Sequence, residues 1–278
     1  MTTLPAGAAR VSAHCDLLVA SCDAYVQEAE VTIRQLVALG FAENFAMHIA
    51  LGDRNLLSRA VPVLRSDPRG TWSSALSQVL AKLDRPYVLL WLDDFVPTKV
   101  VSLAQLQRLV DWTVHADANY LRINPTPRGS GAIVAPNVRE IPSGSPYRTS
   151  TILSIWRRTV LMDLLDPAES AWQFEVAGSV RSDRLGGFFA HDVPLVDTAN
   201  LVVKGLIDPR AERMLRNQGI DLSSLTRPRM SVAQLLSLIA WEALVRLLVR
   251  LPWSVQRVLR AARRSWFVTG LVSSAYGS

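Results

Sequence analysis

Residues 87–94 read YVLLWLDD, six apolar or aromatic residues followed at once by two acids, Asp93 and Asp94. Such a run is typical of a strand that is buried on both faces, as in a parallel sheet. A second apolar run at 16–21 (DLLVAS) leads in the same way to Asp23. Because ligands of open α/β sheets bind beyond the carboxyl ends of the strands, the sequence predicts an α/β fold with these three acids at the binding edge.

Strand and helix patterns alternate along most of the chain. Further strands are predicted at 45–51, 61–64, 120–123, 151–156 and 195–203, and helices at 28–39, 73–83, 102–115, 159–165, 169–180 and 209–217. This alternation predicts a mostly parallel central sheet with helices on both faces. Prolines and glycines punctuate residues 124–147, which leaves room only for short hairpin strands or a loop over the sheet, a place for a substrate-facing insertion.

Charge divides the chain into two parts. Its 278 residues, 49% of them apolar and 19% charged, suit one large globular domain with an appendage and exclude disordered, collagen-like and disulfide-scaffold proteins. From Arg227 onward there are eight arginines and one glutamate, so this segment has a net charge of +7. The whole chain has a net charge of +6, which leaves −1 for residues 1–226. We therefore expect a domain at 1–226 that does not bind nucleic acid and a basic segment at 227–278 that meets any polyanion.

The sequence also bears on the compartment. Residues 1–10 lack the early positive charge and unbroken apolar stretch of a signal peptide, which predicts a cytoplasmic protein. Cys15 and Cys22 would lie about 23 Å apart on an extended strand, beyond disulfide reach, and are expected to be reduced. The most apolar window, 232–249, contains Gln234, Glu242 and Arg246, so no membrane span is expected.

The acid pair has two interpretations. Two acids beside an apolar strand lose hydration, and a divalent cation that bridges to a phosphate offsets this loss. Alternatively, the pair forms a turn in which one aspartate caps a following helix. Since adjacent side chains on a strand point in opposite directions, we expect only one of Asp93 and Asp94 to contact a ligand directly.

Two further residues are candidates for chemistry. Glu175 follows Trp172 and Phe174, and an acid among aromatic residues tends to be partly desolvated, which raises its pKa and suits a general base. The alternative is a surface acid beside two core aromatics. His191 lies in a polar break and is a candidate metal ligand, although no pair of histidines has metal-ligand spacing. The motifs of Rossmann dehydrogenases, P-loop NTPases, α/β-hydrolases and zinc modules are absent from the sequence.

Several short motifs follow one another in a fixed order. They are SCD at 21–23, TWS at 71–73, DDF at 93–95, RINPTP at 122–127, YRTS at 147–150, IWRR at 155–158, WQFE at 172–175, GSVRS at 178–182 and KG at 204–205. In this order, over roughly residues 15–225, the chain resembles GT-A-type glycosyltransferase-like proteins encoded among bacterial capsule and lipopolysaccharide genes. The resemblance implies transfer of a sugar from a nucleotide donor, with uridine nucleotides as the first expectation, to a saccharide or lipid-linked acceptor.

The resemblance also implies roles for single residues. Donor contacts are expected from Asp23, Asp93, Asp94 and Arg148, and Mn²⁺ or Mg²⁺ is expected on Asp94 with His191 as a further ligand. Glu175 would be the base on the acceptor side of an inverting enzyme, and Arg181 would stabilise the leaving phosphate. Either arginine can equally be a surface residue. The acidic motif of the GT-A fold commonly reads Asp-x-Asp, and the intervening residue is missing here, which leaves metal dependence open.

The basic segment is expected to dock on a membrane. A helix is predicted at 231–251 and a second, amphipathic one after Pro252. Anionic lipid at the inner face of the cytoplasmic membrane would be met by Trp253, Arg257, Arg260, Arg264 and Trp266. Alternatively, the two helices pack on the domain or on a second copy. Two other classes of protein stay open, a catalytically silent scaffold with this fold and a basic membrane-surface or nucleic-acid adaptor.

Overall fold

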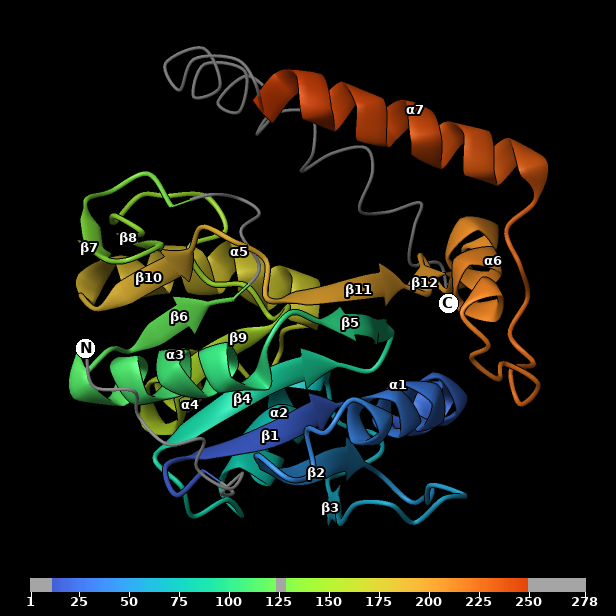
Figure 1. Cartoon of the computed structure of the whole chain (residues 1–278), viewed down its shortest axis with the longest axis horizontal. Helices are drawn as coiled ribbons and strands as arrows, with labels where there is room; N and C mark the ends of the chain where they lie inside the picture. The colour runs from blue at the N-terminus through green and yellow to red at the C-terminus, as the bar shows by residue number, and fades with distance from the viewer. Residues whose placement is uncertain (1–11, 124–128, 250–278) are drawn as a thin grey trace, which may run out of the picture. The chain divides into compact units, whose positions relative to one another are not determined.

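The computed structural model describes residues 12–123 and 129–249 (Figure 1). The chain divides into two compact units, Met1–Arg227 and Pro228–Ser278. The first unit contains the sheet and both sets of helices, and the second contains one described helix. Each unit is described by itself below.

A sheet of nine strands among the described residues forms the centre of the first unit, in the order β3-β2-β1-β4-β9-β6-β10-β8-β7. The strands are β1 Cys15–Ala20, β2 Ala46–Leu51, β3 Val63–Arg65, β4 Tyr87–Leu92, β6 Tyr120–Arg122, β7 Ile133–Ala135, β8 Val138–Glu140, β9 Ser154–Arg157 and β10 Phe188–His191. Only β8 and β9 run against the other described strands of this sheet. The sheet is therefore mostly parallel, as predicted.

Helices cover both faces of this sheet (Figure 1). On one face α1 (Val26–Ala38) and α3 (Leu103–His115) pack against alternate residues of β1 such as Leu17. On the other face, α2 (Trp72–Leu80), α4 (Arg158–Leu164) and α5 (Ala171–Arg181) pack against the residues between them, such as Leu18. Two cores, one on each side of a buried sheet, confirm the predicted α/β class.

The strands β5 and β10 are among those that were not predicted. β5 (Phe95–Val100) contains Pro97, and a proline in the sequence argues against a strand. In the described chain β5 pairs only with β11 (Val196–Asn200), in a separate two-stranded sheet. A strand with a single partner has a free edge, where a proline is tolerated. β10 has only four residues after a pair of glycines. The start of α2 also differs from the expected cap at Ser73 or Ser74, because the side chain of Thr71 accepts the hydrogen bond from the backbone of Ser74.

Smaller elements complete the first unit. They are η1 (Asp23–Tyr25), η2 (Ser182–Arg184), a hairpin of β12 (Val202–Val203) and β13 (Leu206–Ile207), and α6 (Pro209–Asn217). The hairpin turns at Lys204-Gly205, both with positive φ. A third core cluster joins the hairpin, α6, β5 and α1. These elements bring residues from the end of the first unit close to the carboxyl end of β4.

The second unit contains α7 (Val232–Val249). Ser231 starts it with a reciprocal cap, in which its Oγ accepts from the backbone N–H of Gln234 at 3.3 Å and its own N–H donates to Oε1 of Gln234 at 2.8 Å. In the described part of the chain, no helix has the length and apolar character needed to span a bilayer. The residues expected to bind lipid, Trp253, Arg257, Arg260, Arg264 and Trp266, lie outside the described residues.

Candidate functional site

Asp93 and Asp94 form the turn between β4 and β5. The side chain of Asp93 is buried and accepts a hydrogen bond of 2.6 Å from Oγ of Ser21, directly after β1. The backbone carbonyl of Asp93 accepts from Oγ1 of Thr32 at 2.6 Å, and that of Asp94 from the N–H of Leu201 at 2.8 Å. The pair is therefore a turn that leads into the strand β5. The interpretation in which one of the two aspartates caps a following helix is wrong.

The electrostatic environment favours the protonated form of both acids. Burial raises the pKa of Asp93 well above its usual range, and the neighbouring Asp94 raises it further. Burial also raises the pKa of Asp94, to about 7, and the charge of Glu28 acts in the same direction. The positive charge of Arg227 opposes both shifts. Near neutral pH this cluster thus holds a proton readily and gains from a nearby cation.

Arg227 supplies the positive charge beside the pair. Its Nε lies 2.6 Å from Oε1 of Glu28, which is 1% exposed, and its Nη2 donates to the carbonyl of Ala24 at 2.7 Å. Its guanidinium lies 4.0 Å from the centre of the Tyr25 ring. The predicted boundary placed Arg227 in the basic segment at 227–278, whereas in the structure Arg227 belongs to the first unit. A change in local charge was the only sequence signal at this position.

Asp23 shapes the loop that follows β2. Its carboxylate accepts from the backbone N–H groups of Gly52 at 3.0 Å, Asp53 at 2.8 Å and Arg54 at 3.2 Å. Burial raises the pKa of Asp23, but these three donors outweigh it and hold the pKa below its usual range. A side chain at Gly52 would come within 2.7 Å of Asp23 and 2.6 Å of Pro68, so only glycine fits there. Nucleotide contact by Asp23 stays a prediction.

Glu175 is held in a cradle of three donors. Its Oε1 accepts from the N–H of Thr151 at 2.7 Å, from Oγ1 of Thr151 at 2.9 Å and from Oγ of Ser150 at 3.0 Å. The N–H of Ser150 in turn donates to the hydroxyl oxygen of Tyr120 at 3.1 Å. Glu175 is thus half-buried and firmly oriented. The YRTS motif at 147–150 is part of the resemblance, but the sequence did not predict that Ser150, the last residue of this motif, contacts Glu175.

Arg148 has a structural role. It is 2% exposed, and it donates to the carbonyl of Ile141 at 3.0 Å, to Oγ of Ser182 at 3.0 Å and to the carbonyl of Leu185 at 2.8 Å. Its guanidinium also lies 4.0 Å from the centre of the Phe188 ring. These contacts tie Arg148 to the protein itself. Phosphate contact by Arg148 stays a prediction.

Arg181 is paired within the protein as well. Its two terminal nitrogens lie 2.7 and 2.5 Å from the two carboxylate oxygens of Glu169, and its Nε donates to the carbonyl of Leu164 at 3.0 Å. This arrangement ties the end of α5 to the end of α4. The guanidinium thus has a bidentate carboxylate partner in the protein itself. Stabilisation of a leaving phosphate by Arg181 stays a prediction.

His191 ends β10, and its Nδ1 lies 2.6 Å from the carbonyl oxygen of Val193. In the described ranges, no group of three or more histidine, cysteine, aspartate or glutamate side chains is arranged to hold a metal ion. Metal binding by Asp94 and His191 stays a prediction. Both cysteines, Cys15 and Cys22, are free.

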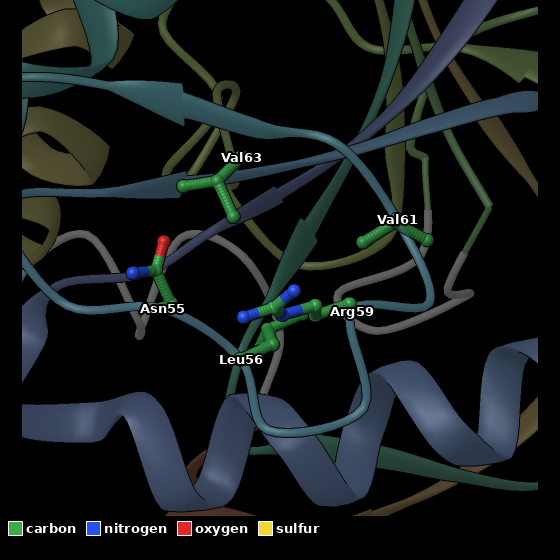
Figure 2. Close-up of a pocket in the computed structure, with 5 residues that line it drawn as sticks. All are labelled: Asn55, Leu56, Arg59, Val61 and Val63. Atoms are coloured by element: carbon green, nitrogen blue, oxygen red, sulfur yellow. The ribbon is translucent and has the colours of Figure 1, made fainter.

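Two separate groups of predicted residues emerge. Asp93 and Asp94 gather with Ser21, Glu28 and Arg227. Glu175 gathers with Ser150 and Thr151 on the face covered by α5. The pocket in Figure 2, of about 170 Å³, belongs to neither group, since it is lined by Asn55, Leu56, Arg59, Val61 and Val63 in the segment from β2 to β3.

Comparisons with known proteins give only distant similarities. No protein-family profile matches the chain, and no curated protein matches it. Among solved structures, TarS of S. aureus is 13% identical with a TM-score of 0.41, over 65% of this chain and 37% of TarS. The mannosyltransferase PcManGT of Pyrobaculum calidifontis, in complex with GDP-Man and Mn²⁺, is 11% identical with a TM-score of 0.47, over 69% of this chain and 58% of that one. UTP-bound UGPase of Acinetobacter baumannii is 12% identical with a TM-score of 0.42, over 67% and 88%. Likenesses this weak do not assign the chain to any of these classes of enzyme.

Proposed function

We propose that this chain is a GT-A-type glycosyltransferase. It moves a sugar from a nucleoside diphosphate donor, a uridine nucleotide in the first instance, to a saccharide or lipid-linked acceptor of the cell envelope at the cytoplasmic membrane face. The observation that carries the proposal is the desolvated Asp93-Asp94 turn at the carboxyl end of β4, beside β1. This is the edge at which open α/β sheets bind nucleotides.

The two acids have different tasks in this proposal. Asp93 is bonded to Ser21 and fixes the turn against the end of β1, whereas Asp94 is the more exposed of the two. Asp94 is therefore the residue that faces the donor diphosphate. Mn²⁺ or Mg²⁺ bound there would take most of its ligands from phosphate and water, because the described residues offer no complete set. Such a cation would neutralise charge on the leaving diphosphate.

Glu175 is proposed as the base that accepts the proton of the acceptor hydroxyl. Three donors hold Oε1 in place. Among the described residues, no hydrogen bond reaches its second oxygen, Oε2, which is thus left to accept a proton from a substrate. This orientation does not depend on the roles predicted for Arg148 and Arg181.

Release of nucleoside diphosphate from nucleotide sugars tests the proposal. We expect Asp94→Asn to lower turnover roughly a hundredfold, the loss that follows removal of one preorganised electrostatic contact. Glu175→Gln should lower turnover by a similar factor without weakening donor binding, because the base acts on the acceptor. Asp197→Asn is the matched control, since Asp197 is an exposed acid of β11. Equal turnover in all four proteins would contradict the proposal.

A second candidate is a catalytically silent scaffold with the same fold. Two observations favour it, the absence of a complete metal-ligand group in the described ranges and the internal pairing of Arg148 and Arg181. Such a scaffold would bind a nucleotide without turning over any nucleotide sugar. Turnover of even one donor by the wild type, lost in Asp94→Asn, excludes it.

A further inference from the structure

Arg122 is the last residue of β6 and one of the most deeply buried side chains of the described chain, at 1% exposure. It is aligned in the sheet with Ser154 of β9 and Ala190 of β10. Tyr120, two residues earlier, packs in the core on the side of α5, and side chains two apart on a strand share a face. The guanidinium therefore lies on the α5 face between two small neighbours.

The hydrogen bonding of Arg122 is incomplete. Its Nη1 donates to the carbonyl of Tyr147 at 2.9 Å, but its Nε is buried without a partner. Among the described residues no carboxylate pairs with it. Arg157 also has a buried Nε without a partner, but its guanidinium forms an ion pair with the exposed Asp117. A buried cation without a counter-charge costs free energy, so this one calls for an explanation.

The polar groups around Arg122 are, in contrast, well paired. Oγ of Ser154 donates to the carbonyl of Ser150 at 2.9 Å and accepts from Nε1 of Trp156 at 3.0 Å. Ser150 also contacts both Tyr120 and Glu175. The unpaired Nε is thus an exception within an otherwise satisfied network, and a bound anion would complete its hydrogen bonding.

The position of Arg122 relates it to both groups of the candidate site. Only β9 separates β6 from β4, so the carboxyl ends of these two parallel strands lie about 10 Å apart, next to the same edge as Asp93 and Asp94. The segment that starts at Tyr147 leads from the Arg122 contact to the Ser150 cradle of Glu175. Tyr147 has a φ of 50°, a strained conformation for a residue other than glycine.

We infer that Arg122 is an anion-binding residue that receives a phosphate group of the substrate. Its planar guanidinium suits two phosphate oxygens. The carbonyl of Tyr147 holds it in the unliganded protein and gives way when the phosphate binds. The phosphate belongs either to the nucleotide donor or to a phosphate-linked acceptor. This assignment of the substrate rests on the proposed function, but binding of phosphate by Arg122 does not.

The test compares Arg122→Met, Arg122→Lys and the matched control Arg157→Met by calorimetric titration with UDP, pyrophosphate, glycerol phosphate and uridine. Arg122→Met should weaken binding of at least one phosphate probe roughly tenfold and leave uridine unaffected. Its unliganded melting temperature should equal or exceed that of the wild type, because an apolar side chain replaces an unpaired buried charge. Arg122→Lys should lose less affinity than Arg122→Met, and Arg157→Met should lose none.

The outcomes separate the sources of the phosphate. A loss for UDP and pyrophosphate alone assigns Arg122 to the donor, and a loss for glycerol phosphate alone assigns it to the acceptor. Unchanged affinity for every probe in Arg122→Met, or no phosphate binding by the wild type, overturns the inference. If Arg122→Met does not fold, unchanged phosphate affinity in Arg122→Lys overturns it. A wild type that binds phosphate but turns over no nucleotide sugar refutes the proposed function and leaves this inference standing.

Discussion

Asp94 couples the candidate site to pH. Its pKa lies at about 7 in the folded chain, against 3.8 for an ordinary aspartate, because of burial and the charge of Glu28. Between pH 3.8 and about 7 the folded protein therefore binds more protons than the unfolded chain. The resulting stabilisation is fully present below pH 3.8 and is lost as the pH rises through about 7.

We expect Asp94→Asn to remove part of this dependence. The free energy of unfolding of the wild type should fall more steeply between pH 3.8 and about 7 than that of the variant. Urea denaturation at several pH values measures both slopes, and Asp197→Asn serves as the control. Parallel slopes in wild type and Asp94→Asn would show that Asp94 ionises normally.

At the scale of elements, Arg227 joins the end of the first unit to α1. It pairs with Glu28 and packs on Tyr25 of η1, while the neighbouring Thr226 donates to Oε1 of Gln27 at 2.9 Å. These contacts hold the end of the first unit against η1 and α1, beside the acid pair. Because Glu28 is fully buried, losing its partner leaves an uncompensated charge.

We therefore expect Arg227→Gln to destabilise the first unit by about 3 kcal/mol. The double variant Glu28→Gln with Arg227→Gln should recover part of this loss, because it removes both charges. Chemical denaturation of the four proteins of this cycle gives the coupling free energy. Additive effects of the two substitutions would mean that the ion pair contributes nothing.

Elements with strong local signals were predictable from the sequence. β4 and α6 have the predicted bounds, and α3 begins after its predicted cap, Ser102. β5 was not predictable, because a proline is tolerated at an edge that only the fold creates. The sequence around β5 does not show that its pairing partner is β11.

The candidate site was predictable in position but not in detail. The acids after β4 lie where the apolar run indicated. The pairing of Arg181 with Glu169 and of Arg227 with Glu28 depends on partners brought close by folding. Burial of Arg122 within a strand is likewise invisible to a charge count, since an arginine in sequence reads as a surface residue.

At the scale of the whole molecule, the two units are expected to have separate tasks. The apolar side chains of Val232, Leu236 and Trp241 on α7 are exposed in the structure, and the arginines that follow are expected to attract anionic lipid. We propose that the second unit docks the chain on the membrane surface, where the proposed function would place a lipid-linked acceptor.

Liposome flotation tests this docking. Binding of the full chain should require anionic lipid and weaken in high salt, because each arginine near the surface contributes about 1 kcal/mol that salt screens. A chain ending at Arg227 should not float, and its fold should persist because Glu28 keeps its partner. A shortened chain that floats as well as the full one would show that the first unit binds lipid.

Nucleotide binding by the wild type tests the central claim most directly. Thermal unfolding is measured with UDP, GDP and ADP at millimolar concentration, with and without Mn²⁺, for wild type, Asp94→Asn and Asp197→Asn. We expect at least one nucleoside diphosphate, first of all UDP, to raise the melting temperature of the wild type and of Asp197→Asn. The rise should be much smaller in Asp94→Asn. If no nucleotide raises the melting temperature under either condition, the Asp93-Asp94 turn is not a nucleotide site.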